Sequence, residues 1–350
     1  MLTNLELQNI ANQKTLISDL SNAELIEFCT IANSSYRIGK PIISDENYDF
    51  IFISELAKRL PKHPFLQNVE AEDGGFSEEK IKLPEKMLST DKAYSWEEVN
   101  KWLERVAKFS EEINYSLNDV EIKGTAKLDG FAGFDDGMKL YTRGDGNKGS
   151  DISRVFERGL GVFNDSRRGQ GPGEIVVKRS YFEKHLGDNF EHPRNFQASL
   201  IKEKELDKFA VDAISEKAAL FVPFTQLPQW LGSIDEFRSQ FLDIVVKLEG
   251  GVDFDVDGVV FEIINPELKE YMGSNRKFHR WQIAFKENKE KAQVKVISVT
   301  AQVGRTGKIT PVAELEPTSL SGATIYRASG HHYGLVKEQG LGAGSVIELT

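Results

Sequence analysis

The sequence is poor in cysteine and has no long apolar run. Cys29 is the single cysteine among 350 residues, so the chain cannot form an internal disulfide or a cysteine-rich zinc site. No apolar stretch approaches the length of a membrane span. The first residues lack the basic start and apolar stretch of a secretion signal. We therefore expect a cytoplasmic protein with no zinc and no membrane partner.

The chain also has fewer basic than acidic residues, with 44 lysines and arginines against 54 aspartates and glutamates. The formal net charge is −10, which argues against a protein that coats nucleic acid non-specifically. Residues 291–350 differ, because six lysines and arginines there stand against four glutamates. We expect a phosphate-facing surface at this C-terminal end, and a solvated surface with ordinary scatter of charge is the alternative.

The length of the chain suits two or three domains. Residues 1–68 predict a small helical module, because a capping box, Ser21-Asn22-Ala23-Glu24, precedes apolar residues at helical spacing. The polar stretch 67–85 contains a glycine pair and predicts a loop or linker. Ser95 begins a second capping box and a further helix.

From about residue 119 the pattern predicts strands. Residues 122–134 and 138–142 flank Asp135-Asp136-Gly137, which has the turn chemistry of a hairpin. Strands over 253–264 and 280–286 alternate with helical segments near 200–219 and 233–249, which together predict an α+β domain over 69–290. Residues 291–350 contain only strand and turn signals. They predict a small barrel that is incomplete, because closure is what removes the edges of a barrel.

The tetrapeptide Lys127-Leu128-Asp129-Gly130 contains a lysine that is a candidate nucleophile toward a phosphate. A lysine that attacks phosphorus must be deprotonated, and since its free pKa is about 10.4, a site must lower it by burial or by a nearby cation. Asp129 could orient the lysine or bind a ribose, and Gly130 lets the backbone approach a nucleotide closely. The alternative is a solvated lysine on a hairpin.

Three later residues have side chains suited to phosphate chemistry. Arg143 lies in a glycine-punctuated turn and could grip a phosphate or a sugar. Asp257 lies in a buried strand and could hold Mg²⁺, and Lys286 ends another strand and could neutralise an α-phosphate.

The order of these motifs resembles that of NAD-dependent DNA ligases. The matching segments are KLDG, TRGDGNKGSDIS, HPRNFQAS, DVDGVVFEI, RWQIAFK and AQVGRTGKITPVAELEP. In addition, MLSTDKAYS resembles the segment that leads into the family's adenylation domain, and ISDENYD resembles its nicotinamide mononucleotide-binding module. The resemblance covers nearly the whole chain. It implies an ATP-grasp-like nucleotidyltransferase domain between the helical module and an OB-fold barrel.

The resemblance also implies a reaction, with NAD⁺ as adenylate donor and Mg²⁺ as metal. Lys127 would attack the α-phosphorus of NAD⁺ and release nicotinamide mononucleotide. The AMP would then pass to the 5′-phosphate at a nick in duplex DNA, and the 3′-hydroxyl would displace it and seal the strand. Positioning and charge neutralisation dominate such chemistry.

By this resemblance, Lys127 and Asp129 are the catalytic residues and Asp257 is the metal ligand. The implied adenylate-binding residues are Ser89, Leu128, Gly130, Arg143, Arg194, Asp257 and Lys286. Those implied for the nicotinamide half are Tyr36, Arg37, Asp45, Tyr48 and Asp49, and those for DNA are Arg305 and Lys308. Two plainer alternatives stay open, with Tyr48 as helix core and Arg305 as a turn residue.

The sequence departs from the family pattern at several positions. Thr125 and Ser180 stand where the family has glutamates, and Glu262 stands where it has a lysine. An anion in place of a cation near an α-phosphate weakens binding by Coulomb repulsion. Three explanations are open. The alignment is off by one pleat, or other basic residues (Lys178, Arg179 or Lys202) supply the charge. Otherwise the protein is a weakened or inactive relative that binds nucleotide or DNA as a scaffold or regulator.

The later parts of the family are also missing from this sequence, namely its zinc finger, helix-hairpin-helix repeats and terminal module. The chain has about half the length expected of a full member. It is either a shortened piece or one subunit of a split ligase whose partner supplies the remaining domains.

Overall fold

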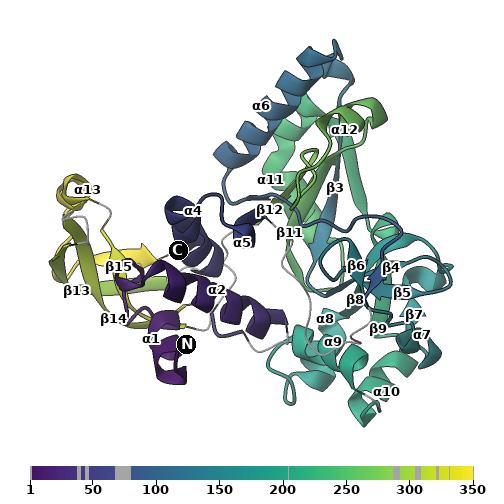
Figure 1. Cartoon of the computed structure of the whole chain (residues 1–350), viewed down its shortest axis with the longest axis horizontal. Coiled ribbons are helices and arrows are strands. Elements are labelled where there is room, and N and C mark those ends of the chain that lie inside the picture. Colours follow the sequence, from purple (N-terminus) through teal and green to yellow (C-terminus); the bar gives the residue numbers. More distant parts are fainter. Residues whose placement is uncertain are drawn as a thin grey trace. The chain divides into compact units, whose positions relative to one another are not determined.

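The computed structural model describes residues 2–37, 41–43, 47–67, 80–203, 205–286, 292–303, 309–320, 323–330 and 332–349. The chain divides into two compact units (Figure 1), one formed by Met1–Gln67 with Asn288–Thr350 and the other by Asn68–Glu287. The division of the chain into three domains, 1–68, 69–290 and 291–350, stays a prediction.

The Asn68–Glu287 unit contains a five-stranded sheet in the order β10-β3-β11-β12-β2. Its strands are β2 (Lys92–Ala93), β3 (Glu121–Leu128), β10 (Gln229–Ser233), β11 (Val256–Ile263) and β12 (Gln282–Phe285). All neighbours are antiparallel except β12 and β2, which are parallel. We call this sheet the lysine sheet, because β3 carries Lys127.

The residues of β3 alternate between two environments, as expected for a half-buried strand. One face is buried and packs under α6 (Trp96–Glu112) and α11 (Ile234–Gly250) (Figure 1). Trp102 and Phe237 lie in this core. The opposite face of β3 carries the side chains of Glu121, Lys123, Thr125 and Lys127. The helix predicted at Ser95 is confirmed as α6, because the Ser95 hydroxyl accepts from the Glu98 N–H at 3.3 Å.

A second five-stranded sheet has the order β5-β4-β8-β9-β7. Its strands are β4 (Phe131–Asp135), β5 (Leu140–Thr142), β7 (Gly161–Val162), β8 (Gly171–Val177) and β9 (Ala219–Pro223). Phe196 and Phe221 lie in the core between this sheet and its helices α7 (Arg154–Glu157), α9 (Pro193–Lys202) and α10 (Lys208–Ser215). The unit also contains β1 (Ile81–Lys82) paired with β6 (Lys148–Gly149), α8 (Arg179–Tyr181), η5 (Phe182–Leu186) and α12 (Pro266–Met272).

The expectation of one continuous strand over 122–134 is wrong. The chain leaves the lysine sheet after Leu128 and enters the second sheet at Phe131. Gly130 lies at the crossing, where an added Cβ would meet the Ile175 carbonyl oxygen at 2.4 Å. No larger residue fits such a close approach of two backbones, so the crossing depends on glycine.

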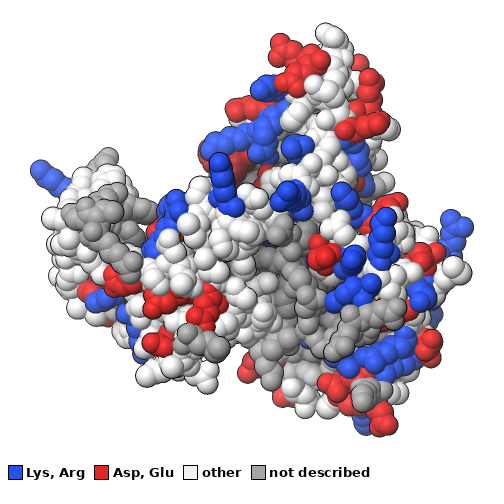
Figure 2. Space-filling model, viewed as in Figure 1, with Lys and Arg blue, Asp and Glu red and all other residues white. Residues whose placement is uncertain are grey.

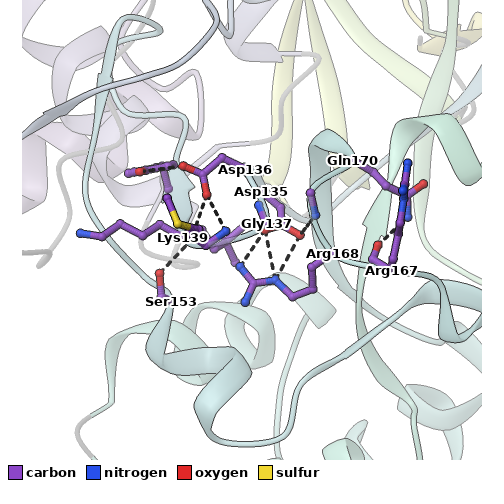
Figure 3. Close-up of polar contacts among 12 residues, drawn as sticks. Asp135, Asp136, Gly137, Lys139, Ser153, Arg167, Arg168 and Gln170 are labelled. Atoms are coloured by element: carbon purple, nitrogen blue, oxygen red, sulfur yellow. Dashed lines mark hydrogen bonds and ion pairs between the residues drawn. The ribbon is translucent and has the colours of Figure 1, made fainter.

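The predicted hairpin is confirmed as β4 and β5. Asp135 is 1% exposed and accepts hydrogen bonds from the N–H groups of Gly137 and Gly169 at 3.1 and 2.9 Å. The Arg168 guanidinium pairs with the same carboxylate at 2.7 Å (Figure 3) and covers the Phe156 ring. This buried charge is therefore fully paired, and it ties the hairpin to the loop before β8.

Residues up to 67 form the predicted helices, which are α1 (Asn4–Ala11), η1 (Ile17–Asp19), α2 (Asn22–Arg37), η2 (Tyr48–Ile53), α4 (Ser54–Arg59) and α5 (Pro64–Gln67). The capping box before α2 is confirmed, because the Ser21 N–H donates to the Glu24 carboxylate at 2.7 Å and the Glu24 N–H donates to the Ser21 hydroxyl at 3.2 Å. Phe28 and Phe52 pack in the core with ring centroids 4.4 Å apart.

The last part of the chain forms a four-stranded sheet in the order β15-β14-β13-β16. The strands are β13 (Ala292–Val303), β14 (Ile309–Leu320), β15 (Ala323–Ser329) and β16 (Val346–Leu349). The expectation of strands and turns alone is wrong, because α13 (Tyr333–Glu338) precedes β16. His332 caps this helix by accepting from the Leu335 N–H at 3.1 Å, which explains why a helix starts there.

The fold class predicted from the sequence, α+β, is confirmed. No helix within the described ranges is long and apolar enough to cross a membrane. Figure 2 shows basic and acidic side chains interleaved on the visible face, with both signs on each unit. The net negative charge therefore does not gather in a single acidic patch on that face.

Candidate active site

Three charged side chains meet at one end of the lysine sheet. Lys127, near the end of β3, donates from Nζ to both carboxylate oxygens of Asp257 at 2.7 and 2.9 Å. Lys286, which follows β12, reaches the same carboxylate at 3.0 Å. The three side chains come from adjacent strands, so their positions are fixed by the register of the sheet. We call this group the Lys127–Asp257–Lys286 triad.

An irregularity in β11 aims Asp257 at the two lysines. The register between β11 and β3 shifts between Val256 and Val259. Gly258, inside the shift, has φ +133°, and a Cβ there would lie 2.1 Å from the Phe285 carbonyl oxygen. Such a bulge re-aims a neighbouring side chain, and only glycine permits it here.

The triad holds its carboxylate ionised. Burial alone would raise the pKa of Asp257, but Lys127 and Lys286 outweigh burial and keep that pKa well below its usual range. The side chains of Lys286 and Asp257 are 10% and 21% exposed, so little water screens them. Two ammonium groups around one carboxylate leave a net positive charge, which suits a substrate phosphate.

The crossing loop after Lys127 is held from several sides. The Asp129 N–H donates to the Asp255 carbonyl at 2.8 Å, and the Gly130 N–H donates to the Glu174 carboxylate at 3.2 Å. The Asp129 carboxylate forms an ion pair with Arg194 of α9. Both side chains of this pair are 14% exposed. The loop therefore joins both sheets and α9 directly beside Lys127.

The first turn of α9 is built to face this loop. Pro193 occupies the first turn, where its missing N–H has no cost. His192 caps the helix by accepting from the Arg194 N–H at 3.2 Å, and its other ring nitrogen lies 4.0 Å from the Asp129 carboxylate. The local sequence thus fixes both the start of α9 and the direction of Arg194.

Glu262 has cationic partners of its own. It lies opposite Lys123 on the neighbouring strand and forms an ion pair with it. Gln282 donates to Glu262 at 3.0 Å, and Lys269 lies 3.9 Å away while it covers the Trp281 ring. The negative charge that departs from the family pattern is therefore compensated inside the lysine sheet.

Register also separates Glu262 from the triad. Its partner Lys123 lies four residues before Lys127 on β3, which corresponds to roughly 13 Å along a strand. Both side chains lie on the face that carries Lys127. An alignment shifted by one pleat is thus not needed to explain Glu262.

The remaining predicted adenylate residues lie in the same unit as the triad. Ser89 lies beside the segment before β12, with its N–H donating to the Lys277 carbonyl at 2.9 Å. Leu128 is the last residue of β3, and its side chain is buried in a core cluster with residues of the second sheet. The main chain of Arg143 donates to the Ala132 carbonyl and begins the turn before β6. Their roles in binding a nucleotide stay predictions.

The predicted nicotinamide residues lie in the other unit. Tyr36 belongs to α2, and Tyr48 and Asp49 begin η2. The Tyr48 hydroxyl donates to the Cys29 carbonyl at 3.3 Å, and its ring packs against the helical core. Asp45, the Arg37 side chain, and the predicted DNA contacts Arg305 and Lys308 lie outside the described residues.

Sequence reasoning missed Glu174 as a site residue. It assigned the expected glutamate to position 180, but Ser180 hydrogen-bonds to Asp253. Glu174 instead lies within β8 and supports Gly130 of the crossing loop. The signal was present as an acidic residue inside the otherwise apolar strand GEIVV, where an ionised group needs a partner.

The triad could also take part in metal binding. Mg²⁺ uses one or two carboxylates together with water and substrate phosphates, so Asp257 beside a phosphate is a suitable donor. Among the residues that the structure describes, no three histidine, cysteine, aspartate or glutamate side chains cluster into a ready-made metal site. Asp257 is engaged by two lysines here, so a metal would share or replace those contacts.

Comparisons with known proteins find sequence relatives of this chain that are described as DNA ligases. The family model of the NAD-dependent DNA ligase OB-fold domain matches residues 293–350. A DNA ligase of Ruthia magnifica subsp. Calyptogena magnifica is 64% identical over 334 residues, which make up 95% of this chain and 54% of that protein. A DNA ligase of Vesicomyosocius okutanii subsp. Calyptogena okutanii (strain HA) is 63% identical over 350 residues, or 100% of this chain and 55% of that protein.

More distant relatives carry the same description. A DNA ligase of Shewanella baltica is 50% identical over 97% of this chain and 52% of its own length. The chain thus spans about half the length of the curated relatives it matches. A solved structure titled "DNA binding with a minimal scaffold: Structure-function analysis of Lig E DNA ligases" has a TM-score of 0.32 at 13% identity, covering 76% of this chain and 92% of that one.

Proposed function

Because this chain is a homologue of DNA ligases over nearly its whole length, we propose that it carries out the NAD-dependent adenylation that begins nick sealing. The observation that carries the proposal is the Lys127–Asp257–Lys286 triad at the end of the lysine sheet. A lysine held beside a carboxylate and a second cation combines a nucleophile with charge to receive a phosphate.

In the proposed first step, the Lys127 ammonium group loses a proton to solvent, and the resulting amine attacks the α-phosphorus of NAD⁺. A P–N bond forms, and the P–O bond to nicotinamide mononucleotide breaks. The mononucleotide leaves with the electron pair, and the lysine nitrogen gives up a proton to solvent. In the next steps AMP passes to the 5′-phosphate at a nick in duplex DNA, and the 3′-hydroxyl displaces it.

In that step, residues of this chain would position Lys127, stabilise the charge on the phosphate and hold the crossing loop. Asp257 stays ionised at neutral pH and holds the Lys127 nitrogen at 2.7 Å, so the nucleophile has one position. Lys286 would stabilise the negative charge on the phosphate. Arg194 and Glu174 hold the crossing loop, which keeps Lys127 aligned with its neighbours.

Mg²⁺, when bound at Asp257, would supply further positive charge to the phosphate oxygens. NAD⁺ as the donor is supported by the OB-fold match over residues 293–350, whose family is NAD-dependent. We propose that the predicted residues Tyr36, Tyr48 and Asp49 hold the nicotinamide half, with the tyrosine rings stacking on it.

Nick sealing by the whole protein is a further proposal, because the chain spans only about half the length of its relatives. We propose nicked duplex DNA as the substrate and OB-fold contacts to its phosphates through Arg305 and Lys308. The rest of the relatives' length would come from the same polypeptide or from a second ligase subunit.

The test is the intact mass of the chain after incubation with NAD⁺ and Mg²⁺. We expect a gain of one AMP with NAD⁺ and none with ATP. Lys127→Ala should abolish the gain, and Lys101→Ala, which changes an exposed lysine of α6, should keep it. If the unaltered chain binds NAD⁺ but gains no mass, the adenylation proposal fails and a scaffold or regulator that binds nucleotide replaces it.

A further inference from the structure

Gln197 is a buried amide that faces the crossing loop. It lies on α9 and is 1% exposed, among the apolar residues Phe196 and Ala198. Its Nε2 donates to the main-chain carbonyl of Asp129 at 3.4 Å. Arg194, three residues earlier on α9, pairs with the carboxylate of the same aspartate. The helix therefore holds Asp129 at both its main chain and its side chain.

The other end of this amide has no hydrogen-bond partner. Gln197 Oε1 is buried and unpaired within the described part of the chain. A buried acceptor without a donor destabilises a fold, whereas an apolar side chain of similar size would not. The single long hydrogen bond from Nε2 does not compensate for this, so stability alone does not account for a glutamine at position 197.

The helix that carries Gln197 is firmly anchored. At its C-terminal end, Arg154 donates to the carbonyls of Ile201 and Lys202, and Arg158 donates to the carbonyl of Glu203. At its N-terminal end, His192 provides the cap. A donor on such a rigid support restrains whatever it contacts, and here it contacts the residue two positions after Lys127.

We propose that Gln197 is a positioning residue for adenylation, in which its amide fixes the Asp129 carbonyl and so the orientation of Lys127. This rests on the proposed function of Lys127 as the nucleophile. Gln197 does not touch the reacting atoms, and it acts through the crossing loop. Its unpaired oxygen is a stability cost that the fold tolerates at a functional position.

The experiment compares single-turnover adenylation by NAD⁺ in the unaltered chain and in Gln197→Leu. We expect the rate constant at saturating NAD⁺ to fall roughly threefold to tenfold, as for the loss of one net hydrogen bond. The NAD⁺ concentration for half-maximal rate should stay within about twofold, because no ligand contact is removed. Thermal unfolding should stay unchanged or rise by about 2–4 °C, because the unpaired acceptor is gone.

Two further variants make the result decisive. Gln197→Met repeats the test with a flexible apolar side chain in case leucine does not pack. Gln226→Leu removes another amide hydrogen bond in the same unit, to Gln170 at 2.7 Å, and should leave the adenylation rate constant unchanged.

The outcomes separate two failures. An unaltered rate constant in folded Gln197→Leu and Gln197→Met overturns the positioning role, as does a lower unfolding temperature with an unaltered rate constant. If the unaltered chain gains no AMP, the proposed function fails first, and the role of Gln197 fails with it.

Discussion

The ion pair between Lys123 and Glu262 can be tested by reversing its charges. Glu262→Lys would place a third cation beside Lys123 and Lys269, which lie next to Glu262 across the lysine sheet. The Glu262 and Lys123 side chains are 12% and 29% exposed, so the energy of this ion pair should lie between that of an exposed pair and that of a buried pair. Exposed pairs contribute about 0–1 kcal/mol, and breaking a buried pair costs about 3–5 kcal/mol. We expect Glu262→Lys to destabilise its unit by about 2–4 kcal/mol.

The assay is thermal unfolding of four chains, namely the unaltered one, Glu262→Lys, Lys123→Glu and the double variant. For a unit of this size, about 1 kcal/mol corresponds to roughly 2–4 °C, so Glu262→Lys should unfold about 5–15 °C lower. The double variant restores opposite charges across the two strands, and its coupling energy should be about 1–3 kcal/mol. If the two single effects simply add, the side chains are not coupled, and the compensation inferred for Glu262 is wrong.

The same variants decide whether Glu262 weakens the site. Glu262 lies opposite a residue four positions from Lys127, roughly 13 Å along β3, and its charge is paired. Glu262→Lys should therefore change the adenylation rate constant of the folded chain by less than about threefold. A large rise would favour the weakened-relative hypothesis, because it would mean that the glutamate opposes phosphate binding.

Three further perturbations have defined outcomes. Asp257→Asn leaves two lysines facing each other and should slow adenylation about 100-fold or more while lowering the unfolding temperature, and the exposed-pair variant Asp165→Asn should change neither. Asp135→Asn should destabilise by about 3 kcal/mol in chemical denaturation, because Arg168 loses its buried partner, and an unchanged midpoint would contradict this. Burial and nearby lysines lower the pKa of His279, so folded-state protonation is opposed, and stability should fall as pH drops below about 6.5. His279→Gln should reduce that dependence between pH 7 and pH 5, as measured by urea unfolding.

The sequence predicts the local features of this fold well. The helix caps at Ser21 and Ser95 each join residues three positions apart, so short-range chemistry decides them. Buried strands such as β11 and β12 follow from their apolar residues. Lys127 and Asp257 are predicted as candidates from the KLDG and DVDGVVFEI segments, which resemble those of NAD-dependent DNA ligases. Their direct contact depends on the register of β11 against β3, which no short segment encodes.

Apart from α13, whose cap at His332 is local, the features that sequence reasoning missed depend on distant partners. Residues 122–134 have the residue pattern of a strand throughout. They are divided between two sheets at Gly130, which closely approaches the main chain of Ile175. Glu174 is anionic in an apolar strand, and its partner is a main-chain N–H 44 positions earlier. From the sequence, Glu262 is an anion where the family pattern has a lysine. Its partner becomes visible only in the register of the sheet, which places it opposite Lys123.

The crossing between the sheets explains why the site residues come from such separate segments. A lysine inside a regular strand would be surrounded only by its neighbours in one sheet. Because the chain leaves the lysine sheet after Leu128, the residue that follows Lys127, supports from the second sheet and from α9 reach the loop beside it. Lys127 itself stays on β3 with Asp257 opposite. Lys127, the proposed nucleophile, is therefore held by one sheet, while the loop that follows is held by the other, and a change in either should alter the rate of the proposed adenylation.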